Sequence, residues 1–367
     1  MNWFEIKNID TIDSPALVIY KERVNENIRL LKWMVNDDVV KLRPHVKTNK
    51  IAEVCSMMLH AGITKFKCAT MAEAEMLAMI KAPDVLLAYQ PVGPKADRFI
   101  KLLLQYPLTH FSCLVDNIHS AEQLSALAVA NQFSISVFID LNTGMNRTGI
   151  TPSKALLLFE AIHLLPVIKV IGLHAYDGHI RDTNVTERTH NVDAGFGKVF
   201  ILAETIEAVS KTKLIIVAGG SPTFPVYAQK ENLECSPGTF IFWDWGYKHA
   251  MPDEPFDYAA LVITRVISII NETTVTTDLG HKSVAAETPL PRVHFLNAPD
   301  AIPVSQSEEH LVLKVANSSM YKPGEVLYGV PVHICPTVAL YETAVVVENN
   351  VATDEWEVVA RKRKITI

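Results

Sequence analysis

The feature that most constrains the fold of this chain is a regular alternation of short apolar runs and longer amphipathic segments between residues 40 and 245. Each apolar run has the length of a strand, and the segment after it places apolar side chains at helical spacing. Seven clear strand–helix pairs, with a weaker eighth strand near residues 241–243, predict parallel strands joined by helices. We therefore expect an α/β fold, a closed (β/α)8 TIM-type barrel and not an open sheet.

The pattern changes near Tyr258, where helical spacing gives way to short β-rich segments. Turn residues separate these segments, and no convincing helix lies between them. The segments are residues 261–267, 273–277, 292–296, 311–315, 342–347 and 356–360. We expect a C-terminal antiparallel β domain at 258–367, with residues 1–18 pairing with it. The barrel would then occupy 19–257.

Composition and charge exclude several classes of function. Hydrophobic residues make up 49% of the chain and charged residues 20%, which supports a large packed core. The net charge of -6 gives no electrostatic basis for binding nucleic acid, and no apolar run has the length needed to cross a membrane. Five cysteines, an odd number, do not indicate a disulfide framework, and the charged residues near Met1 do not suit a signal peptide. We expect a cytoplasmic protein.

Lys47 is the first candidate functional residue. The apolar run 39–42 reads as a strand that Pro44 ends, and Thr48 or Asn49 can cap a helix that begins near residue 51. Lys47 would then lie at the carboxyl end of a strand, where barrels collect their ligands. A desolvated lysine there can act as a Schiff-base nucleophile. Taken alone, the segment favours a solvated loop lysine, and the interpretation depends on other residues at the same rim.

Further polar residues follow later strands of the predicted barrel. Arg147 lies in a glycine-bounded loop after the strand that ends at Asp140, and His174 and Tyr176 follow the next strand. Each could be an ordinary rim residue, so each is a weak signal by itself. Their value lies in the shared position at the carboxyl ends of the strands.

Two glycine-containing loops follow the last strands. In the first, Gly219 and Gly220 let backbone amides converge on an anion, and Ser221 adds a hydroxyl donor. In the second, Gly238 and Thr239 offer the same kind of contribution. A plain glycine turn explains either loop alone equally well, but two such loops in succession match the usual phosphate position of a barrel.

The last cluster lies in the β domain, where His333 and Cys335 are separated by one residue. In an extended segment both side chains would project from the same face. An imidazole and a thiolate can bind zinc and leave positions open for water or substrate. For an isolated pair, a buried cysteine beside an incidental histidine is the favoured alternative, although the flanking Pro331 and Pro336 stiffen the segment.

Together these residues resemble the D-serine dehydratase and D-threonine aldolase family, metal-activated pyridoxal phosphate (PLP) enzymes with the alanine-racemase type of barrel. The resemblance extends over nearly the whole chain. Its most specific segments, in the family's order, are Arg43-Pro-His-Val-Lys-Thr, Ala218-Gly-Gly-Ser-Pro-Thr, Ser236-Pro-Gly-Thr and Val332-His-Ile-Cys-Pro-Thr.

The resemblance implies a role for each candidate residue. Lys47 would bind PLP covalently, Arg147 would approach its phenolic oxygen, and Tyr176 would approach its ring nitrogen. His333 and Cys335 would bind a divalent metal, with zinc preferred over Mn or Mg, and the enzyme would be a homodimer whose active site is shared between one barrel and the partner's β domain. The remaining cofactor contacts would come from His174, Gly219, Gly220, Ser221, Gly238 and Thr239.

Three positions depart from the family pattern. Asn49 replaces a histidine of the family and cannot titrate. His281 is inserted in the segment Asp278-Leu-Gly-His-Lys-Ser283, which otherwise keeps the family's aspartate, glycine and lysine. Phe240 stands where the family frequently has a tyrosine. These changes concern the handling of the substrate more than the binding of the cofactor.

Three functions from different classes remain. They are a PLP- and metal-dependent lyase acting on small D-β-hydroxy-α-amino acids, a metal-independent amino-acid racemase, and a PLP carrier without turnover. The β domain argues against a carrier, and the pair His333 and Cys335 argues against a racemase. Because the family's dehydratases pair histidine with cysteine, Cys335 favours dehydration of D-serine or another D-3-hydroxy amino acid to a 2-oxo acid and ammonia. The alternative is a D-threonine aldolase, which yields glycine and an aldehyde.

Overall fold

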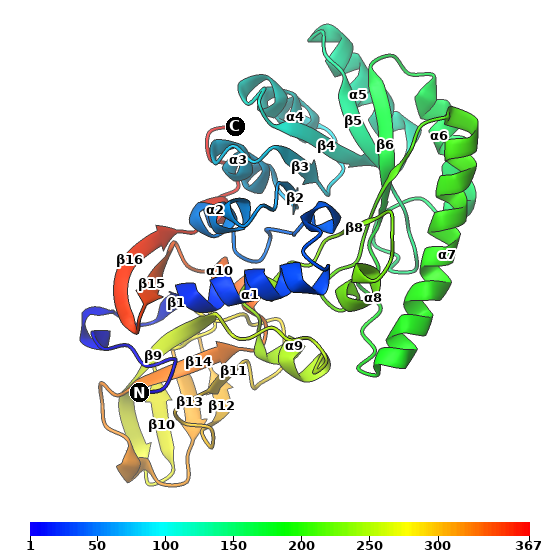
Figure 1. The fold of residues 1–367 in the computed structure, drawn as a ribbon. Helices are drawn as coiled ribbons and strands as arrows, with labels where there is room; N and C mark the ends of the chain where they lie inside the picture. The colour runs from blue at the N-terminus through cyan, green and yellow to red at the C-terminus, as the bar shows by residue number, and fades with distance from the viewer. The chain divides into compact units, whose positions relative to one another are not determined.

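The computed structural model describes residues 1–367, which form two compact units (Figure 1). We call the first the barrel unit; it comprises Lys32–Lys47, Cys55–Gly238 and Lys362–Ile367. We call the second the β unit; it comprises Met1–Leu31, Thr48–Val54 and Thr239–Arg361. None of the helices combines the length and the hydropathy that crossing a bilayer requires.

The barrel unit is built on seven parallel strands that pair in chain order from β2 to β8. The strands alternate with helices because each apolar run is followed by an amphipathic segment, as the sequence predicts. Figure 1 shows α4 to α7 on the outer side of β3 to β6. The elements are α2 (Ala52–His60), β2 (Lys65–Cys68), α3 (Met71–Met79), β3 (Asp84–Leu87), α4 (Pro94–Gln105), β4 (His110–Val115), α5 (Ile118–Ala130), β5 (Ile135–Asp140), α6 (Pro152–His163), β6 (Ile168–Ala175), α7 (Val185–Ser210), β7 (Ile215–Ala218), α8 (Phe224–Ala228) and β8 (Glu234–Cys235).

An irregular segment at residues 42–46 closes the sheet between β8 and β2. On one side Arg43 N donates to Cys235 O at 2.8 Å, and on the other Lys67 N donates to Pro44 O at 2.9 Å. The strand predicted at 39–42 is therefore wrong in detail, because Val39–Lys41 form a 3₁₀ turn, η2. Asn36 and Asp37 both have positive φ, which turns the chain too tightly for an extended run to begin before residue 42.

A buried ion cluster fixes this closing segment. Arg43 is 1% exposed; its Nη1 lies 2.5 Å from Asp84 Oδ1, and its Nε lies 2.6 Å from Glu234 Oε2. Lys65 pairs with the other oxygen of Glu234. Since Asp84 begins β3 and Glu234 begins β8, one guanidinium ties the closing segment to strands on both sides of the gap.

The weak eighth strand predicted at residues 241–243 is also wrong. Thr239–Ile241 form a 3₁₀ turn, η3, and Trp243 N donates back to Thr239 O at 2.7 Å. The run is apolar because Phe242 and Trp243 are fully buried, and burial alone does not distinguish a strand from a tight turn. The last strand is the short β8, which lies earlier in the chain.

The β unit contains a nine-stranded mixed sheet with the path β12-β13-β10-β9-β1-β15-β16 and with β14 and β11 branching from β9. The strand β1 pairs antiparallel with β9 and parallel with β15, so the amino-terminal strand belongs to this sheet. The elements are η1 (Ile9–Thr11), β1 (Ala16–Tyr20), α1 (Lys21–Met34, which continues into the barrel unit), α9 (Trp245–Ala250), β9 (Ala260–Asn271), β10 (Thr274–Thr277), β11 (Val293–Phe295), β12 (Ile302–Gln306), β13 (Leu311–Lys314), η4 (Ser318–Met320), β14 (Val326–Pro331), α10 (Ile334–Val338), β15 (Thr343–Glu348), β16 (Val351–Glu357) and η5 (Val359–Arg361).

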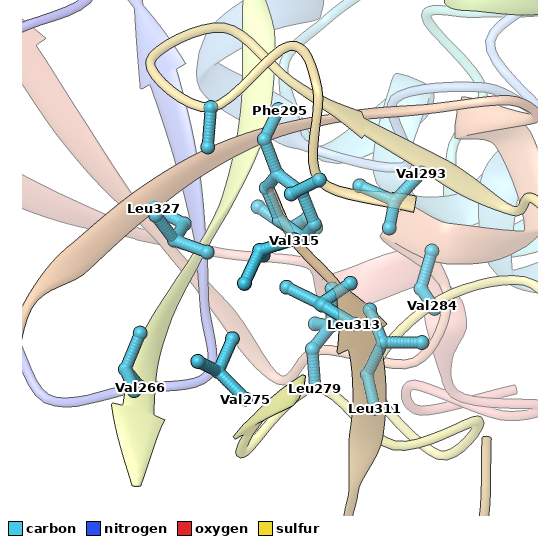
Figure 2. Close-up of a cluster of buried hydrophobic side chains, with 13 residues drawn as sticks. Val266, Val275, Leu279, Val284, Val293, Phe295, Leu311, Leu313, Val315 and Leu327 are labelled. Atoms are coloured by element: carbon cyan, nitrogen blue, oxygen red, sulfur yellow. The ribbon is translucent and has the colours of Figure 1, made fainter. Parts of the chain in front are cut away.

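A buried apolar cluster holds the β unit together (Figure 2). Val275, Leu311 and Leu313 are fully buried and come from the neighbouring strands β10 and β13. Val293 and Phe295 of β11 meet the same cluster, as Figure 2 shows. Alternating inward-facing residues thus build the core, as expected for a largely antiparallel sheet with one face covered. The predicted fold, a barrel with a separate β domain, is confirmed.

Candidate active site

The barrel unit contains a pocket of about 600 Å³ at the carboxyl ends of its strands. Lys47, half-buried in the turn after the closing segment, lines this pocket, and its backbone N donates to His45 Nδ1 at 3.2 Å. Arg147, His174 and Tyr176 line the same pocket. The structure therefore brings together the four barrel residues that the sequence placed at separate strand ends.

Tyr176 is surrounded by cations. Lys47 Nζ lies 6.0 Å from the centroid of its ring, Lys67 Nζ lies 5.5 Å away, and Arg147 Cζ lies 5.0 Å away. The two carboxylates at this rim are bound elsewhere, because Gln90 Nε2 donates both to Asp116 at 3.0 Å and to Asp140 at 2.9 Å. No salt bridge connects a carboxylate to Lys47, Lys67 or Arg147. A pocket with three cations and no neutralising carboxylate favours an anionic ligand.

The first glycine loop packs directly against Tyr176. A Cβ built on Gly220 would approach Tyr176 Cε2 to 2.9 Å, so only glycine allows the ring its position. Gly219 has φ +73°, a conformation that favours glycine. The loop and the pocket are therefore one continuous site within the barrel unit.

The two predicted phosphate loops also meet each other. Gly238 N donates to Ser221 Oγ at 3.3 Å, and Ser236 N donates to Gly219 O at 3.0 Å. The Ser236 Oγ is buried without a hydrogen-bond partner, and such an atom is expected where a ligand supplies the missing bond. This cradle fits the phosphate of PLP. Thr239, at the start of the β unit, has its Oγ1 at 3.6 Å from Cys335 Sγ.

Beneath the pocket lies a polar network that the sequence did not reveal. His174, 4% exposed, has its Nδ1 at 2.7 Å from Asp140 Oδ1 and its Nε2 at 3.4 Å from Lys67 Nζ. Burial, followed by the charge of Lys67, lowers the pKa of His174. Burial raises the pKa of Asp140, but hydrogen bonds led by that from His174 outweigh it and the net pKa is lowered. Asp140 and neutral His174 thus form a fixed pair.

The signal for Lys67 was present in the strand 65–68. Lysines alternate there with Phe66 and Cys68, so Lys65 and Lys67 share one face of a strand whose neighbours are apolar. A lysine among the apolar residues of a barrel strand is unusual, and it could have indicated a functional side chain near the pocket. Its partner His174 could only be found from the structure, because it lies far from Lys67 in the chain.

In the β unit, His333 and Cys335 do interact, although not as predicted. Residues Ile334–Val338 form the short helix α10, so the pair does not lie on an extended segment. The helix forms because Asp244 Oδ2 accepts from Ile334 N at 3.1 Å while its Oδ1 caps α9. Burial raises the pKa of Asp244 to about 6.

The surroundings of this pair suit a metal. His333 Nδ1 lies 2.5 Å from Glu287 Oε1, and Cys335 Sγ lies 3.1 Å from Thr48 Oγ1. Burial lowers the pKa of His333, but the hydrogen bonds to Cys335 and Glu287 outweigh it and raise the pKa to about 9. A carboxylate on one ring nitrogen is the usual companion of a metal-binding histidine. No group of three or more histidine, cysteine, aspartate or glutamate side chains is placed to hold a metal ion, so His333 and Cys335 form a candidate pair of two ligands.

The sequence was also compared with known families and proteins. Residues 19–244 match the model of the alanine racemase N-terminal domain, and residues 259–347 match the model of a serine dehydratase domain. The chain is 26% identical over 356 residues to a D-threonine aldolase from Arthrobacter sp., a match that covers 95% of this chain and 93% of that protein.

Solved structures share the fold. A D-threonine aldolase from Filomicrobium marinum superposes with a TM-score of 0.88 at 24% identity and covers 98% of each chain. A D-threo-3-hydroxyaspartate dehydratase from Delftia sp. HT23 gives a TM-score of 0.82 at 20% identity, over 95% of this chain and 97% of that one. Solved variants of such a dehydratase replace a histidine, or a cysteine two positions later, with alanine, and the cysteine variant is in a metal-free form.

Proposed function

The chain belongs to the D-serine dehydratase-like family of PLP-dependent lyases, in which an alanine racemase N-terminal domain precedes a serine dehydratase domain, and on this premise we propose that it is a metal-activated lyase of D-β-hydroxy-α-amino acids. The observation that supports the proposal most strongly is the pocket in which Lys47 and Arg147 face Tyr176 beside the phosphate cradle. The candidate metal ligands His333 and Cys335 of the β unit add further support to the proposal.

The residues of the barrel unit would bind PLP and move the first proton. When bound, PLP supplies an electron-withdrawing ring that makes the Cα bonds of an amino acid labile. Ser221, Ser236 and Gly238 would hold its phosphate, and Lys47 would be its covalent anchor. Released by the substrate, the Lys47 amine is the pocket's natural base for the Cα proton, since no carboxylate pairs with it.

His333 and Cys335 would hold a divalent metal, and zinc is the ion that a thiolate and an imidazole favour over magnesium. At such a site the metal supplies Lewis-acid polarisation of the substrate's β-oxygen. We also infer a homodimer and, since all five cysteines are free, a reducing compartment such as the cytoplasm.

The pair His333 and Cys335 supports dehydration of D-serine or another D-3-hydroxy amino acid. A histidine and a cysteine with the same spacing were the residues replaced in the solved variants of D-threo-3-hydroxyaspartate dehydratase. The second candidate is aldol cleavage, which the likeness to D-threonine aldolases of Arthrobacter and Filomicrobium favours.

A product assay separates the two reactions. The purified enzyme, supplied with PLP and zinc, is incubated with D-serine and with D-threonine. We expect a 2-oxo acid and ammonia in equal amounts. Glycine and acetaldehyde as the main products would replace dehydration with aldol cleavage, and racemised substrate without cleavage would overturn the lyase proposal.

A further inference from the structure

The pocket contains a second lysine, Lys67, to which no role has been assigned above. Lys67 lies on β2 and is 2% exposed, yet it lines the same pocket as Lys47. A buried ammonium normally has a carboxylate partner, and Lys67 forms no salt bridge. Its side chain is hydrogen-bonded to His174 Nε2 at 3.4 Å.

The hydrogen bonds of His174 determine how Lys67 is presented to the pocket. Asp140 is an acceptor only, so His174 must donate its Nδ1–H across the 2.7 Å contact. The Nε2 of this neutral imidazole is then an acceptor, and Lys67 must donate one N–H to it. The remaining positions of the Lys67 nitrogen face the pocket. The amine is held by one bond and is otherwise free to exchange a proton.

The charges around Lys67 favour easy loss of its proton. Lys47 and Arg147 repel a positive charge on it, and the carboxylates of Asp140 and Asp177 attract one more weakly. Burial is the largest influence, and with the charge of Lys47 it lowers the pKa of Lys67 to about 7. His174 and Tyr176 also face it, and burial lowers the pKa of His174, which favours its neutral form. Both protonation states of Lys67 are therefore accessible near neutral pH.

We propose that Lys67 is a second proton-transfer residue of the active site, which exchanges a proton with the β-oxygen of the substrate while Lys47 serves Cα. Asp140 and His174 are its positioning residues. The inference rests on the proposed lyase activity and deepens it, because both candidate reactions need a proton moved at the β-oxygen.

The proton balance is simple for either reaction. In dehydration Lys47 removes the Cα proton, the electrons of that bond form the Cα–Cβ double bond, and the Cβ–O bond breaks. The Lys67 ammonium gives its proton to the departing oxygen, which leaves as water, and the amine regains a proton from solvent. In aldol cleavage the Lys67 amine takes the β-hydroxyl proton as the Cα–Cβ bond breaks and the aldehyde forms. Cα keeps the electrons of that bond and takes up a proton from solvent through Lys47 to give glycine, and Lys67 returns its proton to solvent.

Two substitutions distinguish proton transfer from simple anion binding. Lys67→Met removes the amine, whereas Lys67→Arg keeps a positive charge that cannot be lost near neutral pH. We expect both to lower kcat by about 10²- to 10⁴-fold with KM little changed, and free methylamine to restore part of the activity of Lys67→Ala. Lys101→Met, at an exposed position of α4, is the matched control and should retain wild-type activity. If Lys67→Arg is active, or if Lys67→Met raises only KM, the proton-transfer role is wrong.

A second measurement does not depend on turnover. Competitive labelling of the purified holoenzyme with acetic anhydride, followed by mass spectrometry across a pH series, reports when each lysine loses its proton. We expect half-maximal reactivity of Lys67 near pH 7, consistent with its lowered pKa of about 7. A midpoint near pH 10, about the ordinary value for a lysine, would overturn the inference. Wild-type enzyme that cleaves neither substrate would instead count against the proposed function, whatever the labelling shows.

Discussion

The barrel pocket differs from the candidate metal ligands of the β unit, His333 and Cys335, most clearly in how its charges are balanced. In the pocket, Lys47, Lys67 and Arg147 gather around Tyr176 without a carboxylate partner. In the β unit, His333 has both a carboxylate, Glu287, and the thiol of Cys335 as partners. Unpaired basic groups favour an anion, whereas an imidazole beside a thiol and a carboxylate is a typical set of groups for a metal cation. The contrast supports the proposal of an anionic cofactor in the barrel unit and a metal ion in the β unit.

The largest effect should follow removal of the covalent anchor. We expect the purified holoenzyme to be yellow, and Lys47→Ala to abolish that colour and to reduce lyase activity to background, because Lys47 is the proposed covalent anchor of PLP. Absorbance spectra and the product assay measure both. The exposed Lys101→Ala should keep colour and activity. A yellow, active Lys47→Ala enzyme would remove the basis of the comparison.

The next prediction contrasts a paired cation of the barrel with the unpaired ones. Arg43→Met leaves the buried Glu234 with Lys65 alone and leaves Asp84 without its guanidinium partner, and we expect it to lower the free energy of unfolding by about 3–5 kcal/mol. Lys67→Met, which removes a buried cation without a carboxylate partner, should leave that free energy unchanged or higher. Urea denaturation of both variants measures the two free energies of unfolding. Equal destabilisation by Arg43→Met and Lys67→Met would contradict the distinction between a cation paired with carboxylates and one without them.

Replacing the metal ligands should reduce activity while the cofactor stays bound. We expect His333→Ala and Cys335→Ser each to lower kcat by about 10²-fold or more, because the metal contributes several kcal/mol of charge stabilisation at the β-oxygen. Elemental analysis should find the metal lost and absorbance should find PLP retained. His310→Ala, at an exposed histidine of the same unit, serves as the control. Active enzyme of normal metal content in either ligand variant would exclude this site.

The smallest effect concerns the carboxylate beside the metal. Glu287→Gln keeps a hydrogen-bond acceptor but removes the charge that orients His333, so we expect metal affinity to fall by about 10- to 100-fold. Titration of the metal-depleted protein with zinc measures the affinity. An unchanged affinity would mean that Glu287 only neutralises the imidazolium in the absence of metal.

The sequence predicted the site residues of the barrel unit better than those of the β unit, and the reason is physical. Alternating strands and helices place every strand end at one rim, so Lys47, Arg147 and Tyr176 could be grouped without knowing any long-range contact. The closing segment could not be predicted in detail, because Asn36 and Asp37 turn the chain before Leu42. The resemblance of the whole chain to its family is confirmed by the two family models.

The arrangement of the candidate residues in the β unit depends on long-range contacts, which local sequence patterns do not encode. The pair His333 and Cys335 was found, but on the assumption of an extended segment. The segment is the helix α10, and the backbone N–H of Ile334 in its first turn donates to Asp244, ninety residues earlier in the chain. Glu287 was missed for the same kind of reason, because its partner His333 is distant in sequence. Lys67 has a local signal in its strand, but its partner His174 is also distant in sequence.

The central claim, that the barrel pocket holds PLP on Lys47, is tested most directly by reducing the holoenzyme with borohydride and mapping the pyridoxyl group by mass spectrometry. The account predicts that the group is found on Lys47 alone, with Lys67 and Lys50 unmodified. A pyridoxyl group on Lys67 or Lys50 in the native enzyme would contradict it.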